Sequence, residues 1–133
     1  MRRSGLLHAE LNRIIAAMGH TDTLVIGDAG LPVPPGVPCV DLAVLPGTPS
    51  FAAVFEAVYT ELAVESVTMA SEIHERNHAM AELSARLRKE GVGVDEVSHD
   101  ELKRLSARAV AVVRSGETSP YANVILHAGV TFR

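Results

Sequence analysis

The sequence predicts an α/β fold in three layers, in which a largely parallel sheet is flanked by helices. Short apolar runs rich in Val and Ile, typical of buried strands, alternate with longer segments whose apolar residues recur every three or four positions, as on one face of a helix. Alternation of this kind produces a mostly parallel sheet covered on both faces. The chain has 133 residues and contains no linker, repeat or low-complexity segment, so residues 1–133 are expected to form one domain.

The first helix and the first strand illustrate the two patterns. Apolar residues recur at helical spacing over residues 7–18, after Ser4 as a candidate cap and before Gly19 as a stop signal. Residues 23–26, Thr-Leu-Val-Ile, then form a β-branched run of the kind found in buried strands. The chain is therefore expected to begin with an amphipathic helix followed by a strand.

The rest of the chain continues this alternation after a stiff loop. Four prolines between residues 30 and 38 exclude a helix there and favour an extended loop that can serve as a pocket wall. The expected elements are then a strand over 40–44, a helix over 51–64, a strand over 66–70, a helix over 74–89, a strand or extended connection over 92–97, a helix over 98–107 with the capping pair Ser98 and Glu101, a strand over 109–113, and a last strand from 124.

Composition argues against several classes of function. A formal net charge of −4, only two lysines and no dense basic run argue against binding to a nucleic-acid backbone. The apolar runs are far shorter than the roughly 20 residues that a membrane-spanning helix needs, and no signal-peptide core follows the basic N-terminus. The one cysteine, Cys39, cannot form an internal disulfide, which is compatible with a reducing compartment, so we expect a cytoplasmic protein.

Phosphate-binding motifs are missing from the sequence as well. Residues 27–30, Gly-Asp-Ala-Gly, follow a predicted strand but match neither the dinucleotide-binding pattern nor the P-loop. A proline-rich loop follows them instead of a helix N-terminus. Nucleotide cofactors are therefore disfavoured.

Three polar turns that contain Gly or Pro adjoin apolar strands, at residues 19–23, 27–32 and 116–123. Turns of this kind let a rigid scaffold present side chains to a ligand. In the first turn, His20 can both give and take a proton near neutrality. In the second, Asp28 follows the carboxyl end of a buried strand, where open α/β sheets bind ligands.

Each polar residue also has a purely structural interpretation. His20 follows a helix C-terminus, where a cation is mildly favoured, and Asp28 is suited to forming a turn. Four other residues also have structural interpretations. His99 is then a surface residue at the start of a helix, and Glu117 is a solvated loop charge. Tyr121 and Asn123 are then strand-entry residues that bond within their own loop.

One motif favours a different function. Residues 74–78, His-Glu-Arg-Asn-His, match the H-E-x-x-H pattern, in which two histidines one helical turn apart bind zinc and the glutamate acts as a base. The two intervening residues include a charged arginine, whereas in such sites they are usually uncharged, and a third ligand is not evident beyond His99 or a downstream Glu. A zinc hydrolase that uses His74, Glu75 and His78 is therefore a remote alternative.

Taken together, the three polar turns resemble the D-ribose pyranase (RbsD/FucU) family. The similarity is carried by Gly-His-Thr-Asp-Thr at 19–23, by Asp-Ala-Gly-Leu-Pro-Val-Pro at 28–34 with Gly36, and by Gly-Glu at 116–117 followed by Pro-Tyr-Ala-Asn at 120–123. It runs through the whole chain in order and length. The Leu-Pro-Val-Pro stretch resembles the ribose branch more than the related fucose mutarotase branch.

The resemblance implies an isomerase that interconverts the pyranose and furanose forms of a free monosaccharide, D-ribose first of all, without metal or cofactor. It implies His20 as the proton donor, and a homo-oligomer, typically a decamer, with sites near subunit contacts. His127 lies outside the implied site and is treated as structural. The alternatives are an L-fucose-type mutarotase and a sugar-binding or transport-associated module without turnover. The resemblance assigns substrate binding to Asp28, His99, Tyr121, Ala122 and Asn123.

The polar turns are expected to converge beside the strand ends, so that the His20 imidazole meets the hydroxyl-binding groups in one cleft. The sequence leaves open whether a neighbouring copy of the chain contributes to that cleft.

Overall fold

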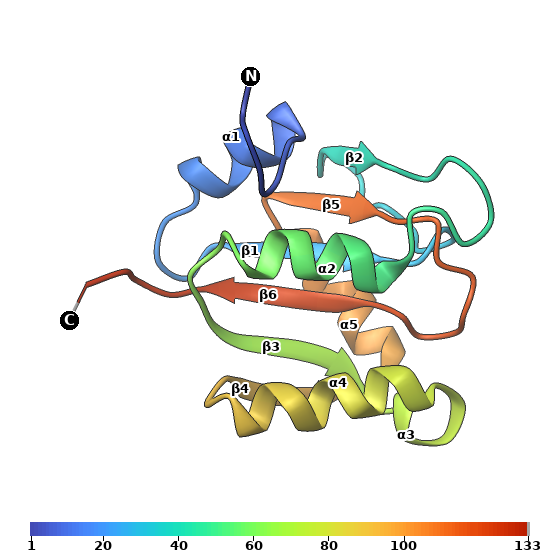
Figure 1. The fold of residues 1–133 in the computed structure, drawn as a ribbon. Coiled ribbons are helices and arrows are strands. Elements are labelled where there is room, and N and C mark those ends of the chain that lie inside the picture. Colours follow the sequence, from blue (N-terminus) through green and yellow to red (C-terminus); the bar gives the residue numbers. More distant parts are fainter. Residues whose placement is uncertain (133) are drawn as a thin grey trace.

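The computed structural model describes residues 1–132, and within them a six-stranded sheet has helices on both faces (Figure 1). In chain order the elements are α1 (Ala9–Ala17), β1 (Thr23–Gly27), β2 (Cys39–Asp41), α2 (Phe51–Tyr59), β3 (Val64–Ala70), α3 (Ile73–Arg76), α4 (His78–Lys89), β4 (Gly93–Val97), α5 (His99–Leu105), a 3-10 turn (Ser106–Arg108), β5 (Ala111–Arg114) and β6 (Val124–Ala128).

The strands are ordered β2-β5-β1-β6-β3-β4 across the sheet. Neighbouring strands are parallel except at β6, which runs antiparallel to both β1 and β3. The prediction of a largely parallel sheet flanked by helices is therefore confirmed. Because β6 is reversed, its first residue lies at the same edge of the sheet as the ends of β1 and β3. That edge brings residues 28 and 123 together.

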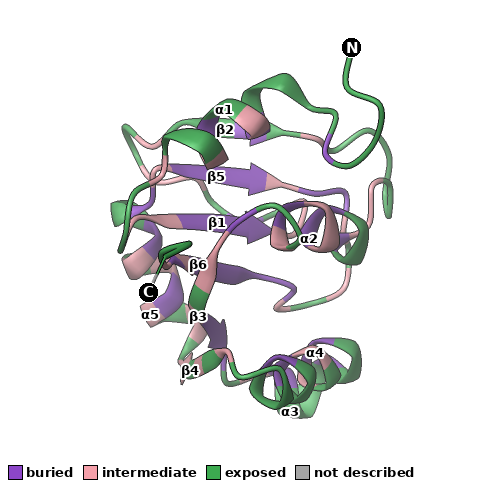
Figure 2. Cartoon of the chain, turned by 60° about the vertical axis from the view of Figure 1, so that its left-hand side comes forward, coloured by how far each residue is buried: buried purple, intermediate pink, exposed green. Residues whose placement is uncertain are grey.

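Different helices cover the two faces of the sheet. On one face, α1, α2 and α4 pack over the larger core, to which β1 contributes Leu24 and Ile26. On the other face, Leu102 of α5 packs against Val25 of β1 and Ile125 of β6. Successive strand residues point to opposite faces, so one apolar run serves both cores. Figure 2 shows the buried strands enclosed by helices with exposed outer sides.

The helices of the described part of the chain are short. None in residues 1–132 combines the length and the apolar character that crossing a bilayer requires.

The first helix starts later than predicted. It begins at Ala9, and its N-cap is His8, whose Nδ1 accepts a hydrogen bond from the Leu11 N–H at 3.2 Å. Gly5 has a φ of 77°, a left-handed conformation that a right-handed helix cannot include. The prediction that Ser4 caps this helix is therefore wrong.

The helix predicted over residues 74–89 is broken at Asn77, between α3 and α4. Asn77 is extended, with φ −148° and ψ 92°. Its side-chain oxygen accepts a hydrogen bond from the Met80 N–H at 3.2 Å and caps α4. His74 and His78 therefore do not lie one turn apart on a continuous helix, which removes the geometry that a zinc H-E-x-x-H site requires.

The other predicted elements are confirmed in type and differ only at their ends. α2 ends at Tyr59 rather than at residue 64, and the Thr60 hydroxyl donates a hydrogen bond to the Glu56 carbonyl at 3.0 Å at this end. The chain then enters β3 at Val64. Such differences are usual where local patterns are the only guide to a helix end.

His127 has a structural partner on β3, and its buried imidazole is expected to make the free energy of unfolding depend on pH. Its Nε2 lies 2.9 Å from the Thr68 hydroxyl. Burial lowers the pKa of His127, although Asp95 and Glu65 act in the opposite direction. A lowered pKa means that the neutral imidazole stabilises the fold fully above the ordinary value of about 6.5 and that this contribution is lost as the pH falls through the folded-state pKa.

As the pH is lowered from about 7 to about 5, we therefore expect the free energy of unfolding to fall less in His127→Gln than in the unmodified protein. Glutamine can keep a hydrogen bond to Thr68 but does not titrate. Urea unfolding at a series of pH values measures the effect, and equal slopes of unfolding free energy against pH in the two proteins would contradict it.

Candidate active site

The end of β1 and the start of β6 form the centre of the candidate site. Asp28 directly follows β1, and Asn123 directly precedes β6. The Asn123 side-chain oxygen accepts a hydrogen bond from the Asp28 N–H at 2.9 Å, which joins segments 95 residues apart. Asn123 is fully buried, and its side-chain nitrogen has no hydrogen-bond partner among residues 1–132. A buried donor of this kind is available to a ligand oxygen.

The turn after β1 is held from two sides. One carboxylate oxygen of Asp28 accepts a hydrogen bond from the Gly30 N–H at 2.8 Å, so Asp28 does form the turn that its structural interpretation predicts. The Ala29 N–H also donates to the Glu117 carbonyl at 2.9 Å. The turn therefore holds one oxygen of the Asp28 carboxylate on the Gly30 N–H and keeps the Asp28 backbone beside Asn123.

His99 and Tyr121 pack edge to face beside this turn. Their ring centroids lie 5.1 Å apart with an interplanar angle of 78°. The His99 N–H donates to both carboxylate oxygens of Glu72, at 3.0 and 3.1 Å, and His99 Nδ1 is buried without a partner among residues 1–132. Tyr121 has a φ of 59°, which bulky residues rarely adopt. Ala122, next to it, is buried in the core and anchors the turn.

These groups suit a neutral ligand with several hydroxyls. The unpaired nitrogens of Asn123 and His99 can bond to hydroxyl oxygens, and the Asp28 carboxylate can accept hydroxyl protons. Through the contacts above, the structure brings together the five residues that the resemblance assigns to substrate binding: Asp28, His99, Tyr121, Ala122 and Asn123.

Gly116 lets the loop before β6 pass close to another backbone segment. A Cβ atom at Gly116 would clash with the Thr48 carbonyl oxygen and would lie 2.7 Å from the Leu45 carbonyl oxygen. Both are backbone atoms, which cannot rotate away.

We expect Gly116→Ala to lower the free energy of unfolding by about 1–3 kcal/mol, measured by urea unfolding. Gly19→Ala is the matched control, because its Cβ would meet only Asp22 Oδ2 at 3.8 Å; an equal effect of the two substitutions would contradict this explanation.

His20 lies at the opposite edge of the sheet. It precedes β1, and the neighbouring Thr21 N–H donates to the Ala128 carbonyl at the far end of β6, at 3.0 Å. The five residues of β1 separate His20 from Asp28 by roughly 16 Å, at about 3.3 Å per residue. The half-exposed imidazole has its Nε2 3.1 Å from Glu65 Oε2. Within one chain, His20 therefore does not share a cleft with the other five residues.

A cavity of about 500 Å³ opens beside His20, between the end of α1 and the segment that follows β6. Exposed apolar side chains at Val130 and Phe132 adjoin it. This surface is open, and the residues that the resemblance assigns to substrate binding lie at the other edge of the sheet.

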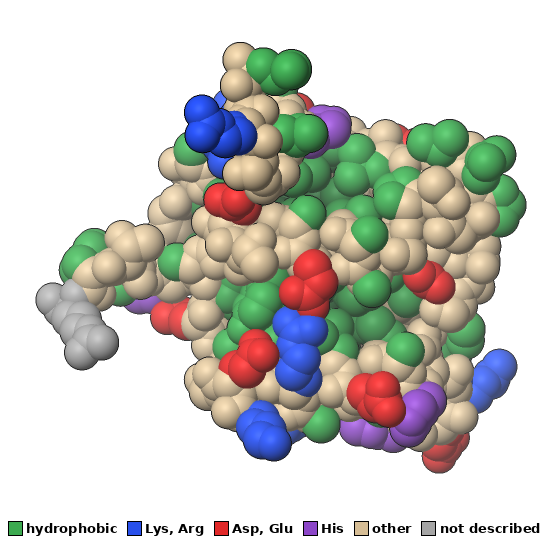
Figure 3. Space-filling view, viewed as in Figure 1, with side chains coloured by type: hydrophobic (Ala, Val, Ile, Leu, Met, Phe, Trp, Pro, Cys, Tyr) green, Lys and Arg blue, Asp and Glu red, His purple; other side chains and the backbone are tan. Residues whose placement is uncertain are grey.

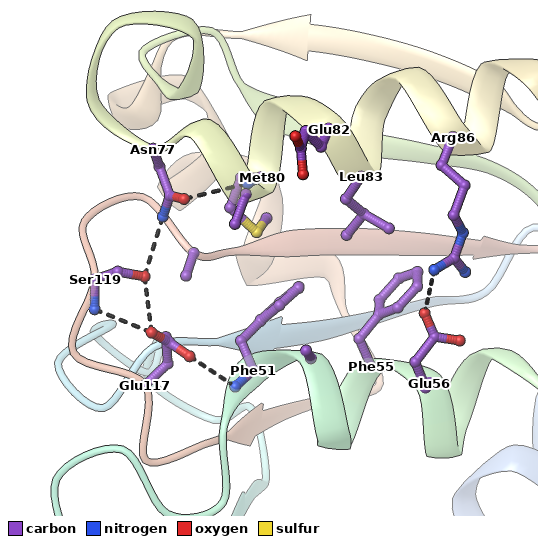
Figure 4. A pocket seen from close by; sticks show the side chains of 13 residues that line it. Phe51, Phe55, Glu56, Asn77, Met80, Glu82, Leu83, Arg86, Glu117 and Ser119 are labelled. Carbon is purple, nitrogen blue, oxygen red and sulfur yellow. Dashed lines mark hydrogen bonds and ion pairs between the residues drawn. The ribbon is translucent and has the colours of Figure 1, made fainter.

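A second cavity, of about 420 Å³, lies between α2 and α4. On this face of the molecule, hydrophobic side chains gather between the two helices, crossed by acidic and basic side chains (Figure 3). Figure 4 shows polar residues at one end of the cavity and an ion pair at the other. The polar end is formed by Asn77, Glu117 and Ser119, the apolar wall by Phe51, Phe55, Met80 and Leu83, and the ion pair by Glu56 and Arg86.

The two histidines of the H-E-x-x-H motif pair separately with carboxylates at the surface. His74 pairs with Glu96, and His78 pairs with Glu82. Among residues 1–132, no three His, Cys, Asp or Glu side chains are grouped so that they could hold a metal ion. The break at Asn77 and these separate pairings disfavour the zinc alternative.

Sequence reasoning missed three polar residues that support the site. Glu72 binds the His99 N–H, Glu65 pairs with His20, and Asn77 binds the loop before β6. Nothing in their local sequence distinguishes them from surface residues, because their partners lie on other elements. Glu117, taken by default as a solvated charge, is instead partly buried and hydrogen-bonded on both oxygens.

Known proteins are similar to this chain along its whole length. The model of the RbsD / FucU transport protein family matches residues 1–131. Curated D-ribose pyranases from Symbiobacterium thermophilum and Variovorax paradoxus are 55% and 52% identical to this chain. Each alignment covers 99% of this chain and 100% of the relative. A solved structure, Bacillus subtilis RbsD complexed with D-ribose, has a TM-score of 0.93 and 45% identity, covering 99% of this chain and 100% of that chain.

Proposed function

The chain belongs to the RbsD / FucU family, and from this membership we propose that it is a D-ribose pyranase, which interconverts the pyranose and furanose forms of free D-ribose. The observation that carries the proposal is the pair of buried side-chain nitrogens of Asn123 and His99, which lack hydrogen-bond partners among residues 1–132 and can bond to the hydroxyl oxygens of a sugar. Full-length identity of 55% to a curated D-ribose pyranase supports the same substrate.

Proton transfer is the catalysis that the ring-opening and ring-closing steps need. A proton leaves the hydroxyl on the anomeric carbon, the bond from that carbon to the ring oxygen breaks to give the open-chain aldehyde, and the ring oxygen takes up a proton. The oxygen of a different hydroxyl then adds to the aldehyde carbon and loses its proton, while the aldehyde oxygen takes up a proton and becomes the new anomeric hydroxyl. Imidazole suits this exchange because it can donate and accept a proton near neutrality. We assign the proton transfer to His20, and the holding of the sugar hydroxyls to Asp28, His99, Tyr121 and Asn123 with Ala122 anchoring the turn.

The position of His20 supports a site shared between subunits. His20 and the sugar-binding residues lie at opposite edges of the sheet of one chain, so His20 reaches a bound sugar only from a neighbouring copy. We propose a closed homo-oligomer, a decamer by family resemblance, in which the His20 edge of one subunit meets the Asn123 edge of the next. We also place the enzyme in the cytoplasm, where the exposed thiol of Cys39 stays reduced.

Exchange spectroscopy on free D-ribose tests the function. In saturation-transfer NMR at equilibrium, the protein should speed the exchange between the pyranose and furanose signals in proportion to its concentration. An unchanged rate, with ribose binding seen by calorimetry, would identify a sugar-binding module and end the proposal. L-fucose run in parallel shows which sugar the enzyme prefers, and faster exchange of fucose than of ribose would assign it to the other branch.

A further inference from the structure

At the polar end of the cavity in Figure 4, the Glu117 carboxylate joins the loop before β6 to the start of α2. One oxygen accepts a hydrogen bond from the Phe51 N–H, at the start of α2, at 3.0 Å. The other accepts from the Ser119 hydroxyl at 2.8 Å and from the Ser119 N–H at 3.3 Å. The loop before β6 is thereby held to the start of α2.

Asn77 holds the same loop to the start of α4. Its side-chain nitrogen donates to the Ser119 hydroxyl at 3.1 Å and to the Pro120 carbonyl at 2.7 Å. Its side-chain oxygen caps α4 through the Met80 N–H. Asn77 is buried, so these bonds are shielded from water. Residues 117–120 are therefore fixed between two helix N-termini, immediately before the sugar-binding residues.

Capping of α2 does not by itself account for the hydrogen bonds of Glu117, because α2 already has an N-cap. The N-cap of α2 is Ser50, whose hydroxyl accepts a hydrogen bond from the Ala53 N–H at 3.1 Å. Partial burial by itself would raise the pKa of Glu117, but hydrogen bonds from Phe51 and Ser119 outweigh it and lower the pKa. The carboxylate is thus held in its charged form, which accepts bonds from both segments at once.

Tyr121 shows why the loop must be held. Its left-handed φ of 59° is unfavourable for a bulky residue and persists only where the surroundings enforce it. The bonds to Ser119 and Pro120 lie directly before it in the chain. The Glu117 backbone carbonyl, moreover, accepts the Ala29 N–H, which ties the Asp28 turn to the same residue.

We infer that Glu117 is a positioning residue for the sugar site: with Ser119 and Asn77 it holds the Tyr121–Asn123 turn in its ligand-binding conformation. Glu117 acts through this turn and does not itself react. The inference rests on the proposed function, because it takes the turn to hold the sugar.

Steady-state exchange kinetics of Glu117→Ala, Glu117→Gln and Ser119→Ala test the inference. Because the turn holds the sugar before and during the reaction, we expect KM for ribose to rise roughly tenfold in Glu117→Ala with kcat little changed. Glu117→Gln keeps one acceptor oxygen, and Ser119→Ala removes one donor, so both should show smaller increases. A purely structural role would instead reduce the fraction of folded enzyme, which lowers the apparent kcat and leaves KM unchanged.

Glu82→Gln is the matched control, because Glu82 lines the same cavity but pairs with His78 at the surface. It should leave KM unchanged. Crystal structures of the variants show directly whether φ of Tyr121 leaves the left-handed region. An unchanged KM in folded Glu117→Gln and Ser119→Ala, with Tyr121 still left-handed, would overturn the inference. Failure of the proposed function would appear separately, as absence of exchange catalysis in the unmodified protein.

Discussion

Replacement of His20 by alanine is expected to lower the rate of catalysed ring exchange by roughly 10²- to 10⁴-fold, the usual contribution of a positioned acid-base group. Without the imidazole, the proton that leaves the anomeric hydroxyl and the proton that reaches the ring oxygen must come from water. Saturation-transfer NMR on D-ribose measures the rate. Calorimetry should show ribose binding reduced far less than the rate.

His74→Ala is the matched control for this substitution. The side chains of His20 and His74 are both 52% exposed, and each pairs with a glutamate. His74→Ala should therefore keep the exchange rate of the unmodified protein. Equal rates in His20→Ala and in the unmodified protein would remove His20 from the mechanism.

Mixed oligomers test whether His20 acts on a neighbouring subunit. His20→Ala chains lack the proton-transfer group, and Asn123→Ala chains show little exchange at ribose concentrations far below their weakened affinity. The two are unfolded, mixed in equal amounts, refolded together and assayed at such a low ribose concentration. If each site combines residues of two chains, about a quarter of the sites regain both groups by random assembly, and exchange activity returns. Activity that stays absent in verified mixed oligomers would place both groups on the same chain.

Replacement of Asn123 by alanine is expected to weaken ribose binding by about 1–3 kcal/mol, or roughly 5- to 150-fold. The substitution removes the unpaired buried nitrogen that is proposed to bind a sugar hydroxyl, and it leaves the Asp28 N–H without its acceptor. Calorimetric titration with ribose measures the loss. Glu82→Gln is again the control, since Glu82 pairs with His78 at the surface of α4, and it should bind ribose normally.

A second measurement separates binding from folding in Asn123→Ala. The Asp28 turn should loosen, but the sheet pairing between β1 and β6 should remain. Urea unfolding therefore reports how much of the effect is loss of stability. Ribose affinity equal to that of the unmodified protein would exclude Asn123 from the sugar site.

The kinds of element along the chain were predictable because each depends on residues a few positions apart. The β-branched run at 23–26 and the capping pair of Ser98 and Glu101 needed no tertiary information, and the structure confirms both. The predictions failed where one local signal was outweighed by another. Gly5 prevents a helix start at Ser4, and Asn77 forms a cap inside an apparently continuous helix.

The residues of the candidate site were recognisable from three short motifs, and the family resemblance they carry is confirmed by the full-length match. The motifs could not show which turns meet. That depends on the reversal of β6, which places Asn123 beside Asp28 and leaves His20 at the other edge of the sheet. Strand direction is set by packing between distant segments, so the residues next to a strand in the sequence do not indicate it.

The sequence alone thus determined the order of helices and strands, the apolar cores and the polar turns, because local spacing decides which side chains share a face. Tertiary structure decided what those turns contact: the Glu117 carboxylate joins the loop before β6 to the start of α2, and His20 lies at the opposite edge of the sheet from the groups with which it is proposed to act. Contacts of this kind join segments tens of residues apart, and their geometry exists only once the sheet has assembled.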